Sequence, residues 1–288
     1  MIDKKWPLRW DLLLRYRLIE IIVLWEGRLT TKHLMDSFGI GRQQASKDIN
    51  NYRRDIGVGN IEYDKYLKGY RPTEQFAPTV ISGNADEYLQ LLSQHTELKN
   101  TFDKLSLAQA NTELLAVPIR NVKPPVIRAI VRAAKEHRRL DVDYVSVSSP
   151  NREGRIIVPH TLIFTGVRWH VRAWCEKNSD YRDFVLSRFR GDVETMEQSE
   201  HNMAGDQKWN TSVTICITPD SRLNDEQQQV VAQDWGMTNS LLEVTVRGPL
   251  VQYALQALHI DVHTIQAKAE AQQIVVANIE QLKPWLFA

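Results

Sequence analysis

The sequence has few cysteines and no long apolar run. Its 288 residues include two cysteines, Cys175 and Cys216, which are too few for a disulfide framework or a zinc knuckle. The longest unbroken apolar run near the N-terminus, residues 21–25, is far shorter than the roughly 20 residues that a membrane-spanning helix needs. No apolar segment with a small-residue cleavage site is present there, so we expect no signal peptide. These absences favour a protein of the reducing cytoplasm with no membrane partner.

The sequence also lacks the short motifs of common enzyme classes. It contains neither a phosphate-binding glycine loop nor the nucleophile elbow of hydrolases. His160 and His170 have no third metal ligand at a suitable local spacing. His259 and His263 are four residues apart, but their segment alternates like a strand and would not place both on one helix face. We therefore expect no enzyme activity, no metal site and no cofactor.

A net charge of +1 conceals a strong separation of charge along the chain. The net charge is +4 in residues 1–75, −3 in residues 76–119, +8 in residues 120–190 and −8 in residues 191–288. Two separate basic blocks favour a nucleic-acid partner over surfaces that merely differ in charge. The acidic C-terminal segment would be repelled by DNA phosphate, so we expect it to contact protein. A dimer interface, or a contact with a basic part of the partner chain, would meet this expectation.

The first 75 residues have the pattern of a helix-turn-helix followed by a hairpin. Apolar residues at three- and four-residue spacing predict an amphipathic helix over residues 8–26. A short second helix, Thr31–Phe38, follows a threonine that can cap it, and a glycine precedes a third helix over residues 41–54. Residues 60–72 alternate around a lysine-containing turn and predict a β-hairpin. This unit is therefore predicted to be a DNA-binding winged helix-turn-helix.

The third helix separates an apolar stripe from a face of hydrogen-bond donors. The predicted DNA-facing residues are Gln43, Lys47, Asn50 and Arg54, flanked by Arg42 and Gln44. Amide side chains can pair with the adenine edge, and basic side chains with guanine or phosphate, so this face suits the major groove. Lys65, Lys68 and Arg71 of the hairpin are expected over a neighbouring phosphate backbone, where they add affinity but no sequence choice. For the third helix taken alone, an ordinary solvent-exposed face is the open alternative.

The middle of the chain changes from helical to strand-like spacing. Helices are predicted near residues 85–94, around the leucines of residues 105–115, and from Pro124 to about Arg139. From Leu140 the apolar residues alternate. This predicts short strands at residues 142–147, 156–158, 162–164, 168–175 and 184–189. Several short strands with turn signals between them favour a small β-barrel.

Four ordered segments of this region resemble a WYL domain. They are DYVSVSS (residues 143–149), RIIVPHTL (155–162), WHVRAWC (169–175) and YRDFVLSRF (181–189). The resemblance implies an Sm-like, SH3-type five-stranded barrel of the kind that follows a helix-turn-helix in bacterial transcription regulators. The order of domains over most of the chain resembles the BrxR/CapW group, whose members are homodimeric repressors associated with phage-defence islands. The naming tripeptide Trp-Tyr-Leu is here Trp169-His170-Val171, so a titratable ring replaces the tyrosine.

The resemblance also implies a ligand pocket in the barrel. Its residues would be Tyr144, Ser146, Arg155, His160, His170, Arg188 and Arg190. Aromatic, hydroxyl, imidazole and guanidinium groups together suit a phosphate-bearing ligand, such as a nucleotide or single-stranded nucleic acid. Two alternatives stay open, namely that His160 is structural and that Arg188 pairs with the acidic C-terminal segment. Trp169, Phe184 and Cys175 are expected in the core.

The C-terminal segment is predicted to be a small α/β domain. Strands are expected at residues 213–217 and 241–246, helices at residues 221–234 and 249–258, and a last amphipathic helix within residues 270–286. Its acidic composition favours a role in dimerisation.

Together these patterns predict an α+β multidomain protein. The predicted parts are a winged helix-turn-helix (residues 1–75), a helical linker (76–139), a WYL-like Sm/SH3-like β-barrel (140–200) and a C-terminal α/β dimerisation domain (201–288). The expected function is transcriptional regulation, namely repression of a phage-defence operon, by a homodimer that binds an inverted repeat in double-stranded DNA and senses a nucleotide-like ligand. The alternative is a nucleic-acid-processing enzyme, a phosphodiesterase or nuclease, that uses His160 and Arg188.

Overall fold

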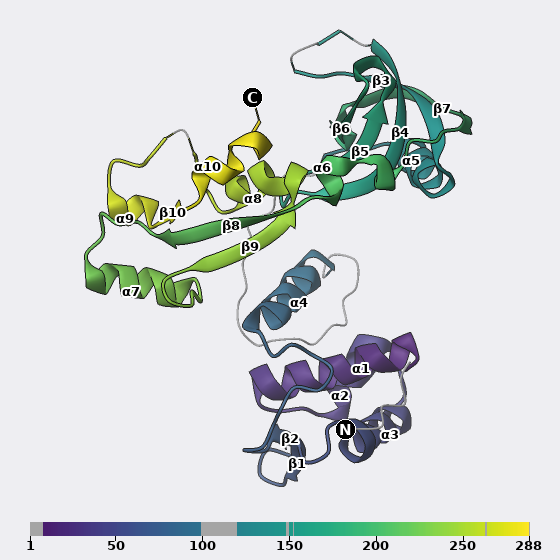
Figure 1. The fold of residues 1–288 in the computed structure, drawn as a ribbon. Coiled ribbons are helices and arrows are strands. Elements are labelled where there is room, and N and C mark those ends of the chain that lie inside the picture. The colour runs from purple at the N-terminus through teal and green to yellow at the C-terminus, as the bar shows by residue number, and fades with distance from the viewer. Residues whose placement is uncertain (1–7, 99–119, 148–149, 152, 263, 288) are drawn as a thin grey trace. The chain divides into compact units, whose positions relative to one another are not determined.

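The computed structural model describes residues 8–98, 120–147, 150–151, 153–262 and 264–287, and Figure 1 shows their elements. The chain divides into two compact units, Met1–Ala116 and Val117–Ala288. Each helix in the described ranges is too short or too polar to span a lipid bilayer. The helix predicted around the leucines of residues 105–115 lies outside the described residues.

The first unit begins with the three predicted helices. With the π-helical turns that extend two of them, its helices are α1 (Trp10–Ile21, then Ile22–Glu26), α2 (Thr31–Phe38), α3 (Arg42–Asn51, then Tyr52–Ile56) and α4 (Ala85–Leu98). At the start of α2 the backbone N–H of Thr30 donates to Nδ1 of His33 over 3.0 Å. Gly39 ends α2 with a φ of 62°, a left-handed conformation that glycine adopts without strain. The sequence thus placed both turns of the helix-turn-helix correctly.

The predicted hairpin completes the winged helix. It consists of β1 (Ile61–Asp64) and β2 (Gly69–Pro72), paired antiparallel with Ile61 opposite Pro72. On its other side β2 forms a bridge to Leu29, since the backbones of Leu29 and Tyr70 exchange two hydrogen bonds of 2.8 Å. The predicted apolar stripe of α3 packs in the core of this unit, where Ala45, Ile49 and Tyr52 are fully buried. The bridge to the buried Leu29 therefore holds the hairpin against the core of this unit.

A buried carboxylate joins α1 to the segment that follows the hairpin. Glu20 is fully buried and accepts the Tyr52 hydroxyl at 2.8 Å. Its two carboxylate oxygens also accept the backbone N–H groups of Thr79, Val80 and Ile81 at 2.9–3.2 Å. A charged acceptor strengthens such bonds, and several donors are needed to compensate for the burial of a carboxylate. Glu20 therefore holds residues 79–81, which follow the winged helix, against α1.

We expect the variant Glu20→Gln to lower the stability of the first unit by about 1–2 kcal/mol, because a neutral amide accepts these hydrogen bonds less strongly than a carboxylate does. Urea unfolding followed by tryptophan fluorescence would measure the loss. The variant Glu87→Gln changes a half-buried carboxylate that accepts from Arg17 and Ser82 and is the matched control, with a smaller expected loss. Equal stability of Glu20→Gln and the wild type would contradict this role.

The second unit contains the predicted WYL-like sheet. Its strands are β3 (Arg138–Tyr144), β4 (Glu153–Phe164), β5 (Trp169–Cys175), β6 (Asp180–Val185) and β7 (Phe189–Gln198). All neighbours are antiparallel, in the order β6-β5-β4-β3-β7. Between the edge strands β6 and β7 no pairing is found in the described part of the chain, so a closed Sm/SH3-like barrel is not confirmed.

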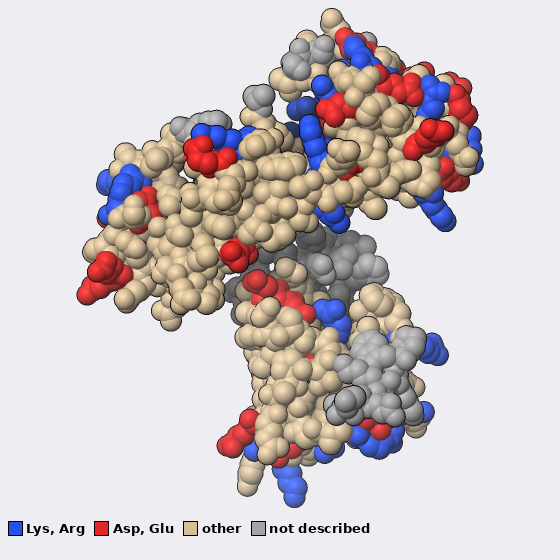
Figure 2. All heavy atoms as spheres, in the orientation of Figure 1, with Lys and Arg blue, Asp and Glu red and all other residues tan. Residues whose placement is uncertain are grey.

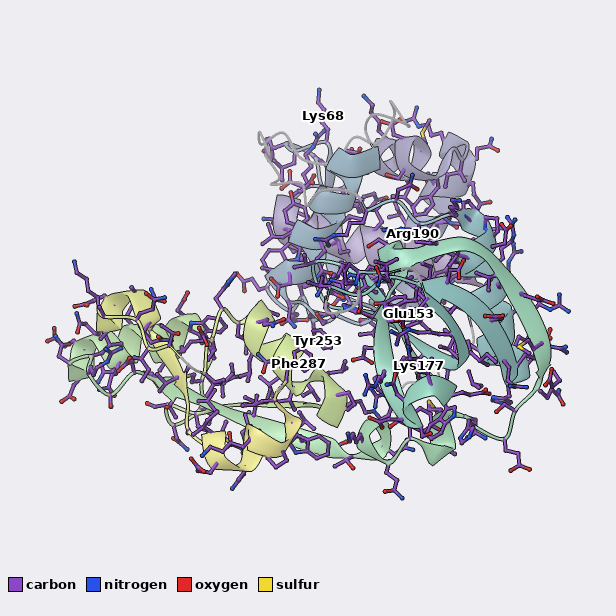
Figure 3. The ribbon with its side chains drawn as sticks, turned by 90° about the horizontal axis from the view of Figure 1, so that it is seen from above. Lys68, Glu153, Lys177, Arg190, Tyr253 and Phe287 are labelled. Carbon is purple, nitrogen blue, oxygen red and sulfur yellow. The ribbon has the colours of Figure 1, made fainter. Side chains whose placement is uncertain are left out.

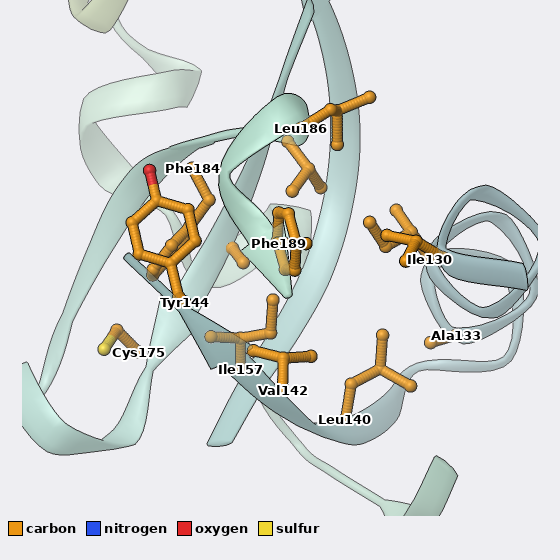
Figure 4. Packing of buried hydrophobic residues seen from close by; sticks show 13 residues of the cluster. Ile130, Ala133, Leu140, Val142, Tyr144, Ile157, Cys175, Phe184, Leu186 and Phe189 are labelled. Atoms are coloured by element: carbon orange, nitrogen blue, oxygen red, sulfur yellow. The ribbon is translucent and has the colours of Figure 1, made fainter. Parts of the chain in front are cut away.

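The helix α5 (Pro124–Glu136) covers one face of this sheet. Val126, Ile130 and Ala133 of α5 are buried in the same cluster as Leu140 of β3 and Ile157 of β4. Figure 4 shows Ile130 and Ala133 directed from the helix toward these strands. A proline pair at the first positions of α5 fits a helix start, since those positions need no N–H donor. The helix that we expected in the linker thus contributes to the core of the sheet.

Two details of the sheet differ from the sequence-based expectation. The strands predicted at residues 156–158 and 162–164 are one strand, β4, in which a register shift at His160 inserts an extra residue. A bulge of this kind lets an otherwise regular strand re-aim a side chain. The expectation that Trp169 is in the core is wrong, because this residue is 50% exposed at the end of its strand. Phe184 and Cys175 are buried, as expected.

The rest of the second unit is a three-stranded antiparallel sheet with short helices. The strands are β8 (Ser212–Pro219), β9 (Leu242–Arg247) and β10 (Ile274–Val276), in the order β10-β8-β9. The helices are α6 (Gln207–Asn210), α7 (Asp225–Asp234), α8 (Val251–Ala257), α9 (Ala269–Gln272) and α10 (Ile279–Leu282). The strands at 213–217 and 241–246 and the two helices after them are thus confirmed, with shorter helices than predicted.

The last predicted helix is interrupted by a strand. Residues Ile274–Val276 form β10, which pairs with the edge of β8 and separates α9 from α10 and the 3-10 turn that follows it. Asn278 accounts for the change, because its side chain accepts the N–H of Cys216 and donates to the carbonyl of Thr214, both at 2.9 Å. The strand-like stretch that begins at His259 is irregular where the structure describes it, and His263 lies outside the described residues.

Candidate nucleic-acid interface

The outer face of α3 presents hydrogen-bond donors to solvent. Arg42, Gln43, Lys47 and Asn50 are exposed, while the opposite face of the helix is buried in the core. A shallow hollow on this face is lined by Arg42, Gln43, Ser46, Lys47, Asn50 and Asn51. This lining contains two cations, three side-chain amides and a hydroxyl, and no carboxylate. Such a surface can donate to base edges and to phosphate oxygens.

A second hollow continues from α3 toward the hairpin. It is lined by Asn50, Arg53, Arg54, Gly59 and Ile61, and it shares Asn50 with the first hollow. The guanidinium carbon of Arg53 lies 5.4 Å from the centre of the Tyr70 ring, so a side chain of the helix end contacts the hairpin. Together the two hollows form a continuous surface from the start of α3 to the start of β1.

Two of the predicted DNA-binding residues have partners within the protein. The Gln44 amide donates to Oδ1 of Asp48 at 2.7 Å, and Asp48 is buried and pairs with Arg15 at 2.8 Å. Arg54 is paired with Asp55 at 2.7 Å and donates to Asn51 at 3.0 Å. Gln44 therefore orders the start of α3, whereas the exposed Arg54 could exchange its carboxylate partner for a phosphate.

The hairpin carries two exposed lysines on its turn. Lys65 and Lys68 have no carboxylate partner within the described residues, whereas Arg71 pairs with Glu62 at 2.7 Å and with Asp64 at 3.4 Å. Lys68 has a φ of 49°, and Figure 3 shows its side chain extending away from the ribbon. In Figure 2, basic side chains are visible at the end of the first unit that carries α3 and the hairpin. Arg71, which we expected over the phosphate backbone together with these lysines, instead pairs with two carboxylates of its own hairpin.

Three residues of this surface were missed by the sequence analysis. Ser46 and Asn51 line the hollow of α3, and Arg53 lines the second hollow. Ser46 lies about 70° from the centre of the predicted face, so a wider helical window would have included it. The contact of Arg53 with the hairpin depends on tertiary packing, which the sequence does not display.

The predicted ligand residues of the second unit do not form one cluster. Tyr144 is buried, its hydroxyl accepts the N–H of Val185 at 3.0 Å, and the guanidinium of Arg155 lies 5.8 Å from its ring centre. Ser146 and Arg188 are half-buried. The exposed Arg190 donates to two backbone carbonyls on its own strand and turn. His160 and His170 contact other residues, which are described below. The structure thus places Arg155 against the ring of Tyr144, whereas His160 contacts Asp206 and His170 contacts Tyr253.

His160 belongs to a buried ionic network between the five-stranded sheet and α6. Its Nε2 lies 3.2 Å from Oδ2 of Asp206, and its Nδ1 lies 2.8 Å from Oγ1 of Thr161. Arg172 of β5 donates to both carboxylate oxygens of Asp206, at 2.5 and 3.1 Å, and to Asp183 at 3.0 Å. An ion pair with the acidic C-terminal segment was the open alternative for Arg188, but it is Arg172 that pairs with Asp206 of that segment.

The environment of this network shifts the pKa values of its members. Burial alone would raise the pKa of Asp206, but hydrogen bonds from Arg172 and from the Trp209 N–H outweigh it and lower the pKa. Burial lowers the pKa of His160, and its contact with Asp206 offsets only part of that effect. His160 is therefore neutral near pH 7 and can hydrogen-bond to Asp206 and Thr161 without carrying a charge. In the described ranges no group of three or more His, Cys, Asp or Glu side chains could hold a metal ion.

His170, the departure from the WYL tripeptide, is also buried. It is 1% exposed and its ring centre lies 5.1 Å from that of Tyr253, which Figure 3 shows beside Phe287. Burial lowers the pKa of His170 to about 4, with further contributions from Arg168, Arg188 and Arg120. The imidazole is therefore neutral at physiological pH, and its protonation would place a cation among three guanidinium groups.

This burial predicts a pH-dependent stability for the second unit. The unfolded chain binds a proton on His170 with an ordinary pKa of about 6.5, whereas the folded chain does so only near 4. Below pH 6.5 the unfolded chain gains a proton on His170 that the folded chain does not accept, so the free energy of unfolding decreases as the pH falls from 6.5 toward 4. Between pH 7 and pH 5 we expect His170 to cost about 2 kcal/mol of stability. The variant His170→Phe should lose correspondingly less stability over this range in urea unfolding, and an unchanged pH dependence would contradict the assignment.

Comparison with known proteins identifies the three parts of the chain. Residues 11–94 match the BrxR transcriptional regulator winged helix-turn-helix domain. Residues 125–193 match the WYL domain, and residues 212–282 match the BrxR transcriptional regulator C-terminal dimerization domain. The WYL match begins within α5, which agrees with the packing of that helix on the sheet.

Several relatives match the chain over nearly its whole length. The chain is 30% identical over 276 residues to the DNA-binding transcriptional repressor CapW of Escherichia coli (strain KTE188), with 95% of this chain and 91% of that protein aligned. It is 29% identical to CapW of Stenotrophomonas maltophilia, with 96% and 93% aligned, and 30% identical to CapW of Pseudomonas aeruginosa, with 96% and 92% aligned. These relatives are regulators and not enzymes. The chain therefore belongs to the BrxR/CapW family of WYL-domain transcriptional regulators.

Proposed function

We propose that the protein is a homodimeric repressor that recognises specific DNA sequences by placing α3 in the major groove. The observation that carries the proposal is the exposed face of α3, on which Gln43, Lys47 and Asn50 line one hollow without a carboxylate. Amide and ammonium groups of this kind pair with adenine and guanine edges. The lysines of the hairpin add contacts to phosphate, which position the helix without choosing sequence.

The proposed operator is an inverted repeat. A dimer places two copies of α3 in a symmetric arrangement, and two winged helices on one face of DNA read half-sites about one helical turn, roughly 34–36 Å, apart. The match of residues 212–282 to a dimerization domain supports a dimer formed through the C-terminal part. The division into residues 1–75, 76–139, 140–200 and 201–288 is proposed as the functional organisation, with repression of a phage-defence operon as the role.

Selection of bound sequences from a random DNA pool tests this function. The full-length protein should enrich a single motif with two-fold symmetry. Enrichment of a motif without symmetry would contradict the dimeric arrangement, while no enrichment above the input pool would contradict sequence-specific binding. Sedimentation of the protein at micromolar concentration provides an independent check, and a monomer would also count against the dimer.

We expect Lys68→Ala to weaken binding to all DNA sequences to a similar extent, because this lysine is assigned to phosphate. The slope of log affinity against log salt should become less steep by about one. Titrations at several salt concentrations measure this slope with the selected operator and with unrelated DNA. The control is Lys135→Ala, which removes an exposed lysine from α5 and should leave the slope unchanged. A change in sequence preference for Lys68→Ala would contradict a phosphate contact.

We also propose that the WYL domain senses a nucleotide or a nucleic-acid-like ligand. The candidate residues are Tyr144, Ser146, Arg155, His160, His170, Arg188 and Arg190. Support comes from the contact of Arg155 with the Tyr144 ring and from the concentration of guanidinium groups on this sheet. For derepression the ligand must bind the DNA-free protein more tightly than the DNA complex. Nucleotides and short single-stranded oligonucleotides titrated against the operator complex would reveal such release, and unchanged operator affinity would contradict sensing of this ligand class.

A further inference from the structure

The turn at the tip of the hairpin is held rigidly. Oδ1 of Asp64 accepts the backbone N–H groups of Tyr66 and Leu67 at 2.7 and 2.9 Å. From the other side, Nε of Arg28 donates to the carbonyl of Leu67 at 2.6 Å. A carboxylate that accepts two successive N–H groups fixes the backbone of a turn. The tip is therefore pinned both by its own strand and by the segment that precedes α2.

This rigid turn exposes one aromatic ring almost completely. Tyr66 is 97% exposed, the largest value among the large hydrophobic side chains described as exposed. The other two tyrosines of the hairpin contact each other, since the rings of Tyr63, which is 54% exposed, and Tyr70 meet edge to face with centres 5.4 Å apart. An exposed ring on a flexible tip would need no explanation, but here the backbone is ordered and presents the ring to solvent.

The surroundings of Tyr66 suit DNA. Lys65 and Lys68 flank the ring, and neither has a carboxylate partner in the described part of the chain. The hairpin borders the hollow that runs from α3 through Asn50 and Arg53 to Ile61. Figure 1 shows the hairpin and α3 at the same end of the first unit. A helix seated in a major groove would thus bring the hairpin tip to the adjacent minor groove.

We propose that Tyr66 enters the minor groove beside the major groove read by α3 and favours A·T base pairs there. This inference rests on the proposed function, because it assumes that α3 occupies the major groove. The phenol can donate to adenine N3 or thymine O2, which are the acceptors that an A·T pair presents in the minor groove. The amino group of guanine occupies the same groove and would block this approach. Lys65 and Lys68 would contact the phosphates on either side of the groove and add affinity without choosing sequence.

The experiment uses the full-length protein and its selected operator. Adenines outside the sequence read by α3 are replaced one at a time by 2,6-diaminopurine, which adds an amino group in the minor groove and preserves the major-groove edge. At one or two positions per half-site the replacement should lower the affinity of the wild type about tenfold, which corresponds to the loss of one base contact. Tyr66→Ala should bind the unmodified operator about tenfold more weakly and should be insensitive to the replacement. Tyr66→Phe keeps the ring and should lose most of the preference for A·T at those positions.

Leu67→Ala, at the neighbouring and less exposed position, is the matched control and should respond to 2,6-diaminopurine as the wild type does. If Tyr66→Ala and the wild type respond equally to the replacement, or if neither responds, the minor-groove contact is wrong. That result would leave the proposed function intact as long as the wild type binds its operator specifically. If the wild type shows no sequence-specific binding at all, the proposed function itself has failed.

Discussion

Replacing Lys47 and Asn50 together by alanine should reduce affinity for the operator by at least 30-fold. Both side chains are exposed on α3 and line the same hollow, one turn apart on the helix. A good side-chain contact to a base edge contributes about 1–3 kcal/mol of discrimination, so the loss of two contacts multiplies to a factor of this size or larger. Binding to unrelated DNA should fall much less, because that binding depends mainly on phosphate contacts. The ratio of operator affinity to scrambled-duplex affinity should therefore fall by nearly the same factor.

Fluorescence anisotropy titrations with the operator and with a scrambled duplex, at one fixed salt concentration, measure both effects. Arg132→Ala is the control, because Arg132 is an exposed cation on α5 that pairs with Glu136 at 3.1 Å. Thermal unfolding should be unchanged in the double variant, since neither residue contributes to the core. A double variant that retained the full specificity ratio would exclude α3 as the reading element.

Replacing Arg172 by methionine should destabilise the second unit by about 3–5 kcal/mol. The arginine side chain is 4% exposed, and it bridges Asp206, which is 1% exposed, and Asp183, which is 10% exposed. Removing one member of a buried ion pair leaves the other charges without compensation, which costs more than the pair contributes when intact. His160 would keep its contact with Asp206, but an imidazole whose pKa is lowered is neutral and cannot replace the cation. The second unit should therefore unfold at a lower urea concentration.

Urea unfolding of the full-length protein measures this effect, and the first unit provides an internal reference because it contains none of these residues. Arg190→Met removes an exposed arginine from the same sheet and should change the stability by less than about 0.5 kcal/mol. A loss below about 1 kcal/mol for Arg172→Met would mean that the network is solvated in solution. Such a result would also mean that the contact of Arg172 with Asp206 does little to hold α6 against the five-stranded sheet.

Elements dominated by local patterns were predictable from the sequence. The helices around the turn of the helix-turn-helix depend on spacing, on Thr30 and on the glycines at their ends, all of which are visible in the sequence. The donor face of α3 followed from the same periodicity. In contrast, β10 was predicted as helix because its apolar residues fit either period, and the contacts of Asn278 with β8 decide the outcome. Tertiary hydrogen bonds of this kind are not visible in one sequence.

The ligand residues show a different limit of sequence analysis. The motifs placed Tyr144 and His170 correctly on strands, whereas His160 was expected between two strands and lies within β4. Strand position also does not reveal the neighbours of a side chain. The bulge at His160 directs its ring to Asp206, which lies 46 positions later, in the segment predicted as the C-terminal domain. Arg172 was overlooked because it stands in an otherwise aromatic and apolar strand, where its two carboxylate partners cannot be foreseen. A lone cation in such a strand is a signal for a buried ion pair.

The affinity ratio between the selected operator and a scrambled duplex, measured for the full-length protein near physiological salt, tests sequence-specific DNA binding most directly. Recognition of base edges by α3 in both subunits predicts a ratio of at least about 1,000, with one dimer per inverted repeat. A ratio near one, with the same salt dependence on both duplexes, would mean that the protein binds DNA only through its charge and would contradict the proposed function.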